Sequence, residues 1–296
     1  MSLFCYNEAC TKDFLNLEQD VITAKKVGFD IIELRFDCIN RYLENHSLTD
    51  LKNLLTKTGL KLSALNALYI YPEFLGDNDI KDKHDALCNT LKQIEELHDV
   101  IGINECIVVA PLLENDTLCA NYKDFDIKAA CTKILKHLAT SMPYIRWIFE
   151  PVGLSRSLVQ DADYAYQIIK EVNCENVGLV LDSYNLYLKN RNDAYSFKEI
   201  DPKKVFAIHL MNGQKIPNDE PIVNQRYRTL CDEGDAINLN NFLNALSEIN
   251  YKGMISTEVF NPNYPKLYTQ EEIIQRAYLS LKTTIESYEI VSEHRF

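Results

Sequence analysis

The stretch Val177-Gly178-Leu179-Val180-Leu181-Asp182 is an apolar run of strand length that ends in a carboxylate. A continuous apolar run, rather than an alternating one, is typical of a strand that is buried on both faces in a parallel sheet. Similar short runs recur along the chain. They predict eight strands, at residues 2–6, 30–35, 61–68, 105–110, 145–150, 177–182, 204–210 and 253–259.

Longer amphipathic segments separate these runs, with apolar residues at three- and four-residue spacing that is typical of helices. Helix ends are marked by residues that favour caps and stops. The expected starts and stops are Ser47 or Thr49, Asn238, Gly28, Gly59 and Gly102. Eight strand-then-helix units predict an α/β fold, a (β/α)8 TIM barrel, and we interpret residues 1–296 as one domain.

The composition excludes several classes of function. Hydrophobic residues make up 46% and charged residues 25% of the chain, as in an ordinary globular protein. The net charge of −12 repels both a phosphate backbone and an anionic membrane surface, so we expect neither nucleic acid nor membrane as a partner. Nine cysteines without a CxxC pair imply no disulfide framework, and no signal or membrane segment is evident, so we expect a cytoplasmic protein.

Four chemically active residues stand at or near the ends of four predicted strands: Glu150, Asp182, His209 and Glu258. Parallel barrel strands all end at one rim, so these side chains are expected to converge there. Each has an ordinary explanation alone, since Asp182 could cap the next helix and His209 could be a hydrogen-bonded core histidine. Together, three carboxylates and one imidazole favour a single divalent metal ion, Mn²⁺, Zn²⁺, Co²⁺ or Mg²⁺.

A cation at this rim would hold two adjacent oxygens of a hydroxy ketone and stabilise the charge of a cis-enediolate. Glu150 and Glu258 would then be the catalytic acid and base of an isomerase or epimerase that acts on a sugar or polyol ketone. Polar residues near strand ends are candidates for contacts with this small-molecule substrate, namely Arg228, Asn66, Glu33 and Asn185. The polar, irregular segment 211–237 is expected to form an active-site lid.

The chain resembles, over nearly its whole length, the xylose isomerase-like barrels described as sugar phosphate isomerases/epimerases. Within them it is most similar to the 2-keto-myo-inositol (inosose) isomerases of inositol catabolism. The stretches that carry this resemblance include Cys5-Tyr6-Asn7-Glu8-Ala9, residues 176–183 and Glu258-Val259-Phe260. The resemblance implies that Glu150, Asp182, His209 and Glu258 are metal ligands, that both glutamates act in catalysis, and that the loop arginine is Arg228. The resemblance is also compatible with a homo-oligomer.

The chain departs from this family at several polar positions. Many relatives carry histidine where this chain has Asn185, and aspartate where it has Met211 and Asn212. These changes remove the ligands expected for a second metal, so one metal is favoured. They also leave two alternatives open. One is a metal-dependent dehydratase of a cyclic polyol ketone, similar to inosose or dehydroshikimate dehydratases, and the other is a barrel that binds sugar without catalysis.

Overall fold

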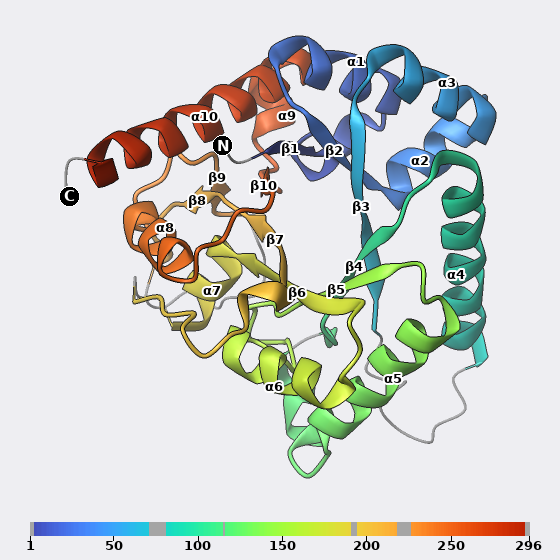
Figure 1. The fold of residues 1–296 in the computed structure, drawn as a ribbon, viewed down its shortest axis with the longest axis vertical. Helices are drawn as coiled ribbons and strands as arrows, with labels where there is room; N and C mark the ends of the chain where they lie inside the picture. Colours follow the sequence, from blue (N-terminus) through green and yellow to red (C-terminus); the bar gives the residue numbers. More distant parts are fainter. Residues whose placement is uncertain (1–2, 71–80, 115, 191–193, 218–225, 294–296) are drawn as a thin grey trace.

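The computed structural model describes residues 3–70, 81–114, 116–190, 194–217 and 226–293. Within these ranges, parallel strands close into a barrel in the order β1-β10-β7-β6-β5-β4-β3-β2, and helices surround it (Figure 1). This architecture confirms the predicted TIM barrel. The barrel strands are β1 (Phe4–Asn7), β2 (Ile31–Arg35), β3 (Lys61–Tyr69), β4 (Glu105–Val109), β5 (Arg146–Glu150), β6 (Val177–Asp182), β7 (Val205–His209) and β10 (Ile255–Thr257).

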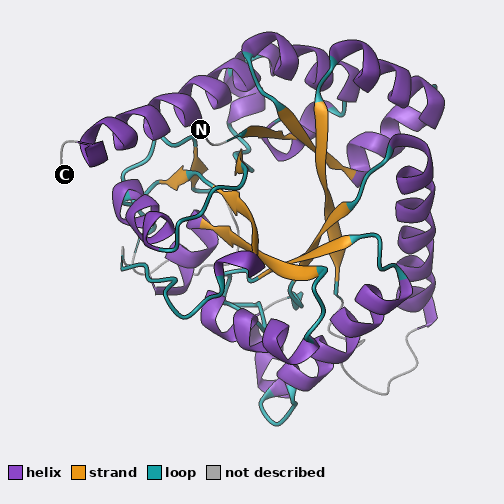
Figure 2. Ribbon diagram, viewed as in Figure 1, coloured by secondary structure: helices purple, strands orange, loops and turns teal. Residues whose placement is uncertain are grey.

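Helices lie between consecutive barrel strands and form the outer layer (Figure 2). Their caps follow local sequence: Ser47, rather than Thr49, caps α3 in a capping box with Asp50, and Asn238 caps α8. Gly28 and Gly59 end α1 and α3 in the left-handed conformation that glycine adopts easily. The helices are α1 (Leu17–Val27), α2 (Phe36–Leu43), α3 (Leu48–Thr58), α4 (Lys81–Ile101), α5 (Ile127–Ser141), α6 (Ala162–Val172), α7 (Ser183–Asn190), α8 (Leu239–Glu248), α9 (Tyr264–Leu267) and α10 (Gln270–Glu293).

The register of the strands brings their polar ends to the same rim. Asp182 lies opposite His209 across β6 and β7, and Asn7 lies opposite Glu33 across β1 and β2. Because all these strands run in one direction, residues far apart in sequence meet at the carboxyl end of the barrel. The fold therefore assembles a polar rim above a core of apolar side chains.

The segment 211–237 was predicted from its sequence to be irregular, and this prediction is wrong for part of it. It contains a two-stranded antiparallel ribbon of β8 (Asn212–Gly213) and β9 (Arg228–Thr229), and the ribbon carries Arg228. Residues 218–225 of the expected lid lie outside the described residues. Among the helices of the described residues, none combines the length and the apolar character that crossing a membrane requires.

Candidate metal centre

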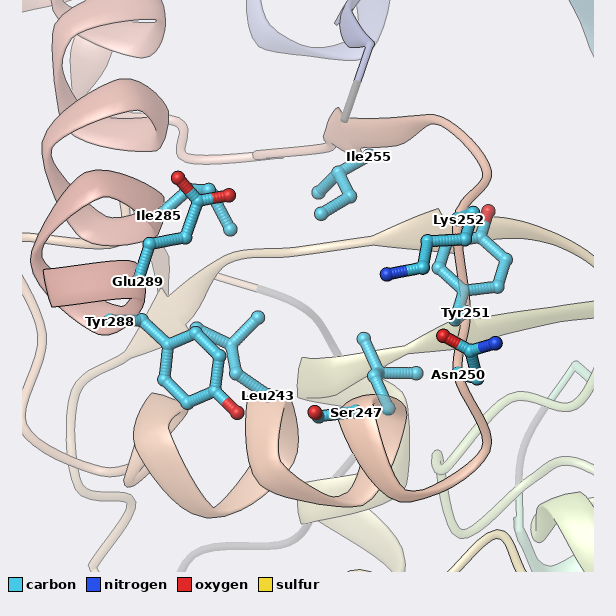
Figure 3. A pocket seen from close by; sticks show the side chains of 10 residues that line it. Leu243, Ser247, Asn250, Tyr251, Lys252, Ile255, Ile285, Tyr288 and Glu289 are labelled. Carbon is cyan, nitrogen blue, oxygen red and sulfur yellow. The ribbon is translucent and has the colours of Figure 1, made fainter. Parts of the chain in front are cut away.

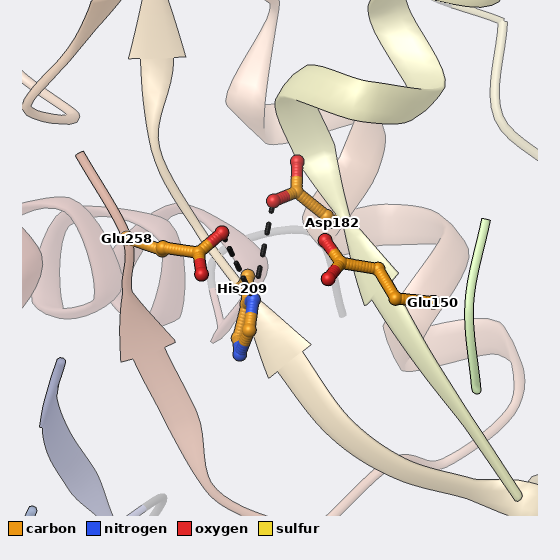
Figure 4. Close-up of side chains that lie close together, drawn as sticks. All are labelled: Glu150, Asp182, His209 and Glu258. Carbon is orange, nitrogen blue, oxygen red and sulfur yellow. Dashed lines mark ion pairs between the residues drawn. The ribbon is translucent and has the colours of Figure 1, made fainter. Parts of the chain in front are cut away.

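Four side chains converge at the carboxyl end of the barrel (Figure 4). Glu150, Asp182 and His209 are the last residues of β5, β6 and β7, and Glu258 directly follows β10. One ligand atom from each lies within 4.8 Å of the others, and all four side chains are buried. The structure therefore brings together the whole set of residues that the sequence indicated as metal ligands.

His209 presents one ring nitrogen to this cluster and the other to a different carboxylate. Its Nε2 lies 3.1 Å from Oε2 of Glu33. Its Nδ1 lies 3.4 Å from Glu258 and 3.9 Å from Asp182, and this nitrogen has no hydrogen-bond partner although it is buried. A buried polar atom without a partner is costly, and a cation would satisfy it. The donor set of one imidazole and three carboxylates thus fits a divalent ion.

Glu33, expected among the substrate contacts, lies behind His209 with no exposed surface. Its Oε1 accepts hydrogen bonds of 2.8 Å from both Asn7 and Asn66, and its Oε2 faces His209. Both carboxylate oxygens are therefore occupied by the protein itself. A carboxylate in this position orients a metal-binding histidine and fixes which ring nitrogen carries the proton.

Asn66 connects this orienting group to the proposed catalytic pair. Its side-chain nitrogen donates to Oε1 of Glu33 and, at 2.7 Å, to Oε1 of Glu258. Arg228 contacts the other oxygen of Glu258 at 3.1 Å and Oδ2 of Asp182 at 2.9 Å, both through Nη1. Glu258 is thus held from two sides, while Nε and Nη2 of the fully buried Arg228 have no partner.

Asp182 both accepts a hydrogen bond at the start of the next helix, as its sequence position suggested, and faces the cluster. Its Oδ1 accepts a hydrogen bond of 2.7 Å from the backbone N–H of Asn185 at the start of α7, and its Oδ2 faces the cluster. The side chain of Asn185 donates to Oε1 of Glu150 at 2.9 Å. Its own Oδ1 is buried and has no partner, which leaves an acceptor next to the cluster.

The close approach of these groups shifts their protonation in the protein alone. Burial raises the pKa of Glu150 well above its ordinary value, and the charge of Glu258 adds to this. Burial also opposes ionisation of Glu258, but His209 and Arg228 outweigh it and hold the pKa of Glu258 well below its usual range. Burial would lower the pKa of His209, yet Glu33 and Glu258 raise it. The cluster therefore retains protons that a bound cation would displace.

The residues that depart from the family pattern have clear structural partners. Asn212 donates to the carbonyls of Cys231 and Gly234, and its Oδ1 accepts from the N–H groups of Gly213 and Ile237. An aspartate could not donate to these two carbonyls, so the amide matches its surroundings. Asn212 closes the ribbon that carries Arg228 and does not face the cluster of four.

Arg35, Asp37 and Phe260 form a group of contacts beside the centre. Arg35 ends β2, and its guanidinium lies 5.5 Å from the centre of the Phe260 ring, as does that of Arg228. Arg35 also makes an ion pair with Asp37. Asp37 was not among the candidates from sequence, because an exposed acid at a helix start is usually a capping or surface residue. Its position two residues after Arg35 is the signal that could have identified it.

Other clusters and cavities do not have the same chemistry. The cavity between α8 and α10 is lined by apolar residues and tyrosines and by the polar side chains of Ser247, Asn250, Lys252 and Glu289, and its lining includes no histidine or cysteine (Figure 3). A second buried group consists of Glu8, Asp20 and Cys38 and contains no histidine. Among the described residues, Glu150, Glu258 and a histidine meet only at the centre of Figure 4.

The family model described as Xylose isomerase-like TIM barrel matches residues 21–284 of the chain. An inosose isomerase from Bacillus subtilis (strain 168) is 34% identical over 285 residues, which are 95% of this chain and 96% of that protein. One from Bacillus velezensis is 32% identical over 287 residues, which are 96% of this chain and 97% of that protein. A crystal structure of the protein IolI with a bound zinc atom superposes with a TM-score of 0.83. It is 31% identical in sequence and covers 97% of this chain and 99% of that one.

Proposed function

Because the chain belongs to the xylose isomerase-like TIM barrel family, we propose that it is a divalent-metal-dependent isomerase of a polyol ketone, with 2-keto-myo-inositol as the leading substrate. The observation that carries this proposal is the buried meeting of Glu150 and Glu258 with Asp182 and His209. The similarity to inosose isomerases along nearly the whole chain supports the choice of substrate. None of the nine cysteines forms a disulfide in the part of the chain that the structure describes, which supports a reducing cytoplasmic location.

Glu150, Asp182, His209 and Glu258 would hold the ion, with Nδ1 as the ligand atom of His209. A bound divalent ion supplies positive charge where negative charge develops on the adjacent oxygens of a hydroxy ketone. The zinc atom in the similar IolI structure supports zinc as one candidate, and the donor set also suits Mn²⁺, Co²⁺ and Mg²⁺.

Glu150 and Glu258 are the proposed acid and base. They project from strands on different sides of the cluster, and each is oriented by an amide donor, Asn185 for Glu150 and Asn66 for Glu258. One carboxylate would remove the proton from the carbon that carries the hydroxyl. The other would return a proton to the neighbouring carbon while the hydroxyl proton passes to the former carbonyl oxygen, so that the positions of carbonyl and hydroxyl exchange.

Arg228 and Asn185 are the proposed substrate-binding residues. The free Nε and Nη2 of Arg228 are donors, and the free Oδ1 of Asn185 is an acceptor. Buried groups of this kind recover their lost hydration when a polyhydroxylated ligand binds to them. Glu33 and Asn66 are instead hydrogen-bonded within the protein. We therefore propose that Glu33 orients His209 and that Asn66 orients Glu258.

The first test is Glu258→Gln, assayed with 2-keto-myo-inositol in heavy water and each of the four divalent ions. We expect the wild type to exchange a carbon-bound proton and to form a product of unchanged composition. The variant should lose at least on the order of 10²-fold in rate, because an amide cannot transfer the proton. Glu105→Gln, at the opposite end of the barrel, is the control and should keep the rate.

The same assay separates the alternatives. A product that is lighter by one water would identify a dehydratase. Metal-dependent stabilisation by the ketone without any proton exchange would identify a binding protein. Full exchange by Glu258→Gln would contradict the assigned role of Glu258.

A further inference from the structure

A second guanidinium group, that of Arg35, lies near the proposed substrate site. Arg35 lies opposite Asn66 in the register of β2 and β3, and Asn66 is bonded to Glu258. The guanidinium of Arg35 contacts Phe260, two residues beyond Glu258. The charge of Glu258 acts on Arg35 and on the half-exposed Tyr69 next to it. Arg35 therefore faces the approach to the catalytic pair.

Asp37 occupies the hydrogen-bonding fork of this arginine. Nε of Arg35 donates to Oδ1 of Asp37 and Nη2 donates to Oδ2, both at 2.9 Å. The Arg35 side chain is 13% exposed and that of Asp37 is 44% exposed, so the pair lies at the edge of the mouth. Two parallel bonds of this kind are also how arginine binds a phosphate group. A phosphate and Asp37 would compete for the same two donors.

We propose that Asp37 is a specificity-determining residue that makes the site prefer an uncharged polyol ketone over a phosphorylated polyol. This rests on the proposed function, because it concerns the substrate class of the same site. With Asp37 in place, a phosphate that binds the Nε–Nη2 edge of Arg35 must displace a carboxylate. It must also approach a centre that already contains three carboxylates, in a protein whose net charge is −12. A neutral polyol meets neither obstacle.

An ordinary structural role for Asp37 makes a different prediction. Asp37 lies in the first turn of α2, and its Oδ1 also accepts from the N–H of Cys38 at 3.0 Å. If that contact with the helix start were its whole function, its removal would change stability and leave ligand preference unaltered. Ligand preference is therefore the readout that separates the two roles.

The experiment compares the affinities of 2-keto-myo-inositol and myo-inositol 1-phosphate for the metal-loaded protein by titration calorimetry. In Asp37→Asn, one oxygen remains to accept from Cys38, but the charge that holds Arg35 is gone. We expect the affinity for the phosphate to rise on the order of tenfold and that for the ketone to change less than about twofold.

Three controls accompany this variant. Glu44→Gln removes an equal charge from the C-terminal end of α2, where Glu44 pairs with the exposed Arg41, and should leave the preference unchanged. Arg35→Gln combined with Asp37→Asn should abolish the gain. Arg35→Gln alone should alter phosphate affinity little, because Asp37 occupies the Nε and Nη2 fork of the wild-type guanidinium; this variant also tests the proposal if Asp37→Asn does not fold.

The proposal is overturned if Asp37→Asn leaves the preference unchanged, if Glu44→Gln gives the same gain, or if the gain persists without Arg35. It is also overturned if Arg35→Gln alone weakens phosphate binding strongly, or if the wild type binds neither ligand. Binding of the ketone without proton exchange would defeat the proposed function while leaving this assignment intact.

Discussion

At the scale of single residues, the geometry of His209 decides which of its nitrogens is available to an ion. Glu33 faces Nε2, and this leaves Nδ1 directed at Glu258 and Asp182. A carboxylate behind a ligand histidine fixes the ring and increases its basicity. Glu33 thus influences the centre without being one of the four residues that surround it.

Glu33→Gln tests this influence. A glutamine retains one acceptor but places an amide where a carboxylate now accepts from Asn7, Asn66 or His209. We expect the affinity for Zn²⁺ or Mn²⁺ to fall about 10- to 100-fold, measured by competition with a chelator. Glu105→Gln changes a carboxylate at the other end of the barrel and should leave metal affinity unchanged. Equal losses in both variants would mean that general destabilisation explains the effect.

At the scale of elements, the parallel strands explain why so much of the centre could be predicted. Glu150, Asp182 and His209 end three strands, and a barrel brings all strand ends to one rim whatever their separation in sequence. The positions of the strands follow from short, continuous apolar runs, which are typical of strands buried on both faces. The ribbon of β8 and β9 could not be found in this way, because strands of two residues have no measurable period.

The hydrogen-bond partners of the buried polar side chains could not be predicted from the sequence either. The sequence places polar residues near the strand ends, namely Glu33, Asn66 and Asn185. Which of them faces substrate depends on the direction of each side chain and on differences in distance as small as the length of a hydrogen bond. Asn66 and Glu33 are joined to each other and to the ligands, whereas Asn185 keeps a free acceptor. Such differences arise from packing between strands and leave no pattern in a single chain.

Asn212→Asp tests the ribbon as an element. The change removes both hydrogen bonds from Nδ2 and places a carboxylate oxygen opposite the carbonyls of Cys231 and Gly234. We expect a loss on the order of 2–3 kcal/mol in the free energy of unfolding. Gly213 pairs with Arg228 across the ribbon, so KM should also rise on the order of tenfold as Arg228 shifts.

Asn176→Asp is the matched control for the ribbon. Its side chain likewise donates to two backbone carbonyls, those of Ala139 and Ile145, but it lies just before β6 at the opposite end of the barrel. This variant should lose comparable stability with no change in KM. A rise in KM in both variants would show that the ribbon has no special part in holding Arg228.

At the scale of the whole molecule, a buried acidic group links the first helix, the last helix and the barrel. Asp20 accepts hydrogen bonds from Thr11 at 2.7 Å and from Gln270 of α10 at 2.8 Å, while its other oxygen has no partner. Burial raises the pKa of Asp20 to about 7, although the hydrogen bonds from Gln270 and Thr11 oppose this. Burial likewise raises the pKa of the neighbouring Glu8.

This group makes stability depend on pH in a defined direction. The folded protein retains a proton on Asp20 up to about pH 7, whereas the unfolded chain releases it near pH 4. Folded molecules therefore bind more protons between these values, and stability falls as pH rises through them, by on the order of 4 kcal/mol for Asp20 alone. The loss is complete above about pH 7.

Asp20→Asn should remove the part of this dependence that Asp20 contributes, because the amide keeps an acceptor and carries no charge. Denaturant unfolding at pH 5 and at pH 8 should show the variant closer to the wild type at pH 5 and more stable than it at pH 8. Asp13→Asn, at an exposed site beside Lys12, should match the wild type at both values. A variant that is less stable than the wild type at pH 8 would contradict the assignment.

The amide of Asn66, described above as bonded to both Glu33 and Glu258, has a consequence for how such a barrel acquires new substrates. Because Asn66 donates both to Glu258, a proposed acid or base, and to Glu33, which orients His209, a change at Asn66 affects both carboxylates at once. Substitutions are then best tolerated at Arg35, Asp37 and Tyr69, because changes there leave both hydrogen bonds of Asn66 intact. Changes of substrate specificity, natural or engineered, would therefore begin at these three residues while the residues of the metal centre stay the same.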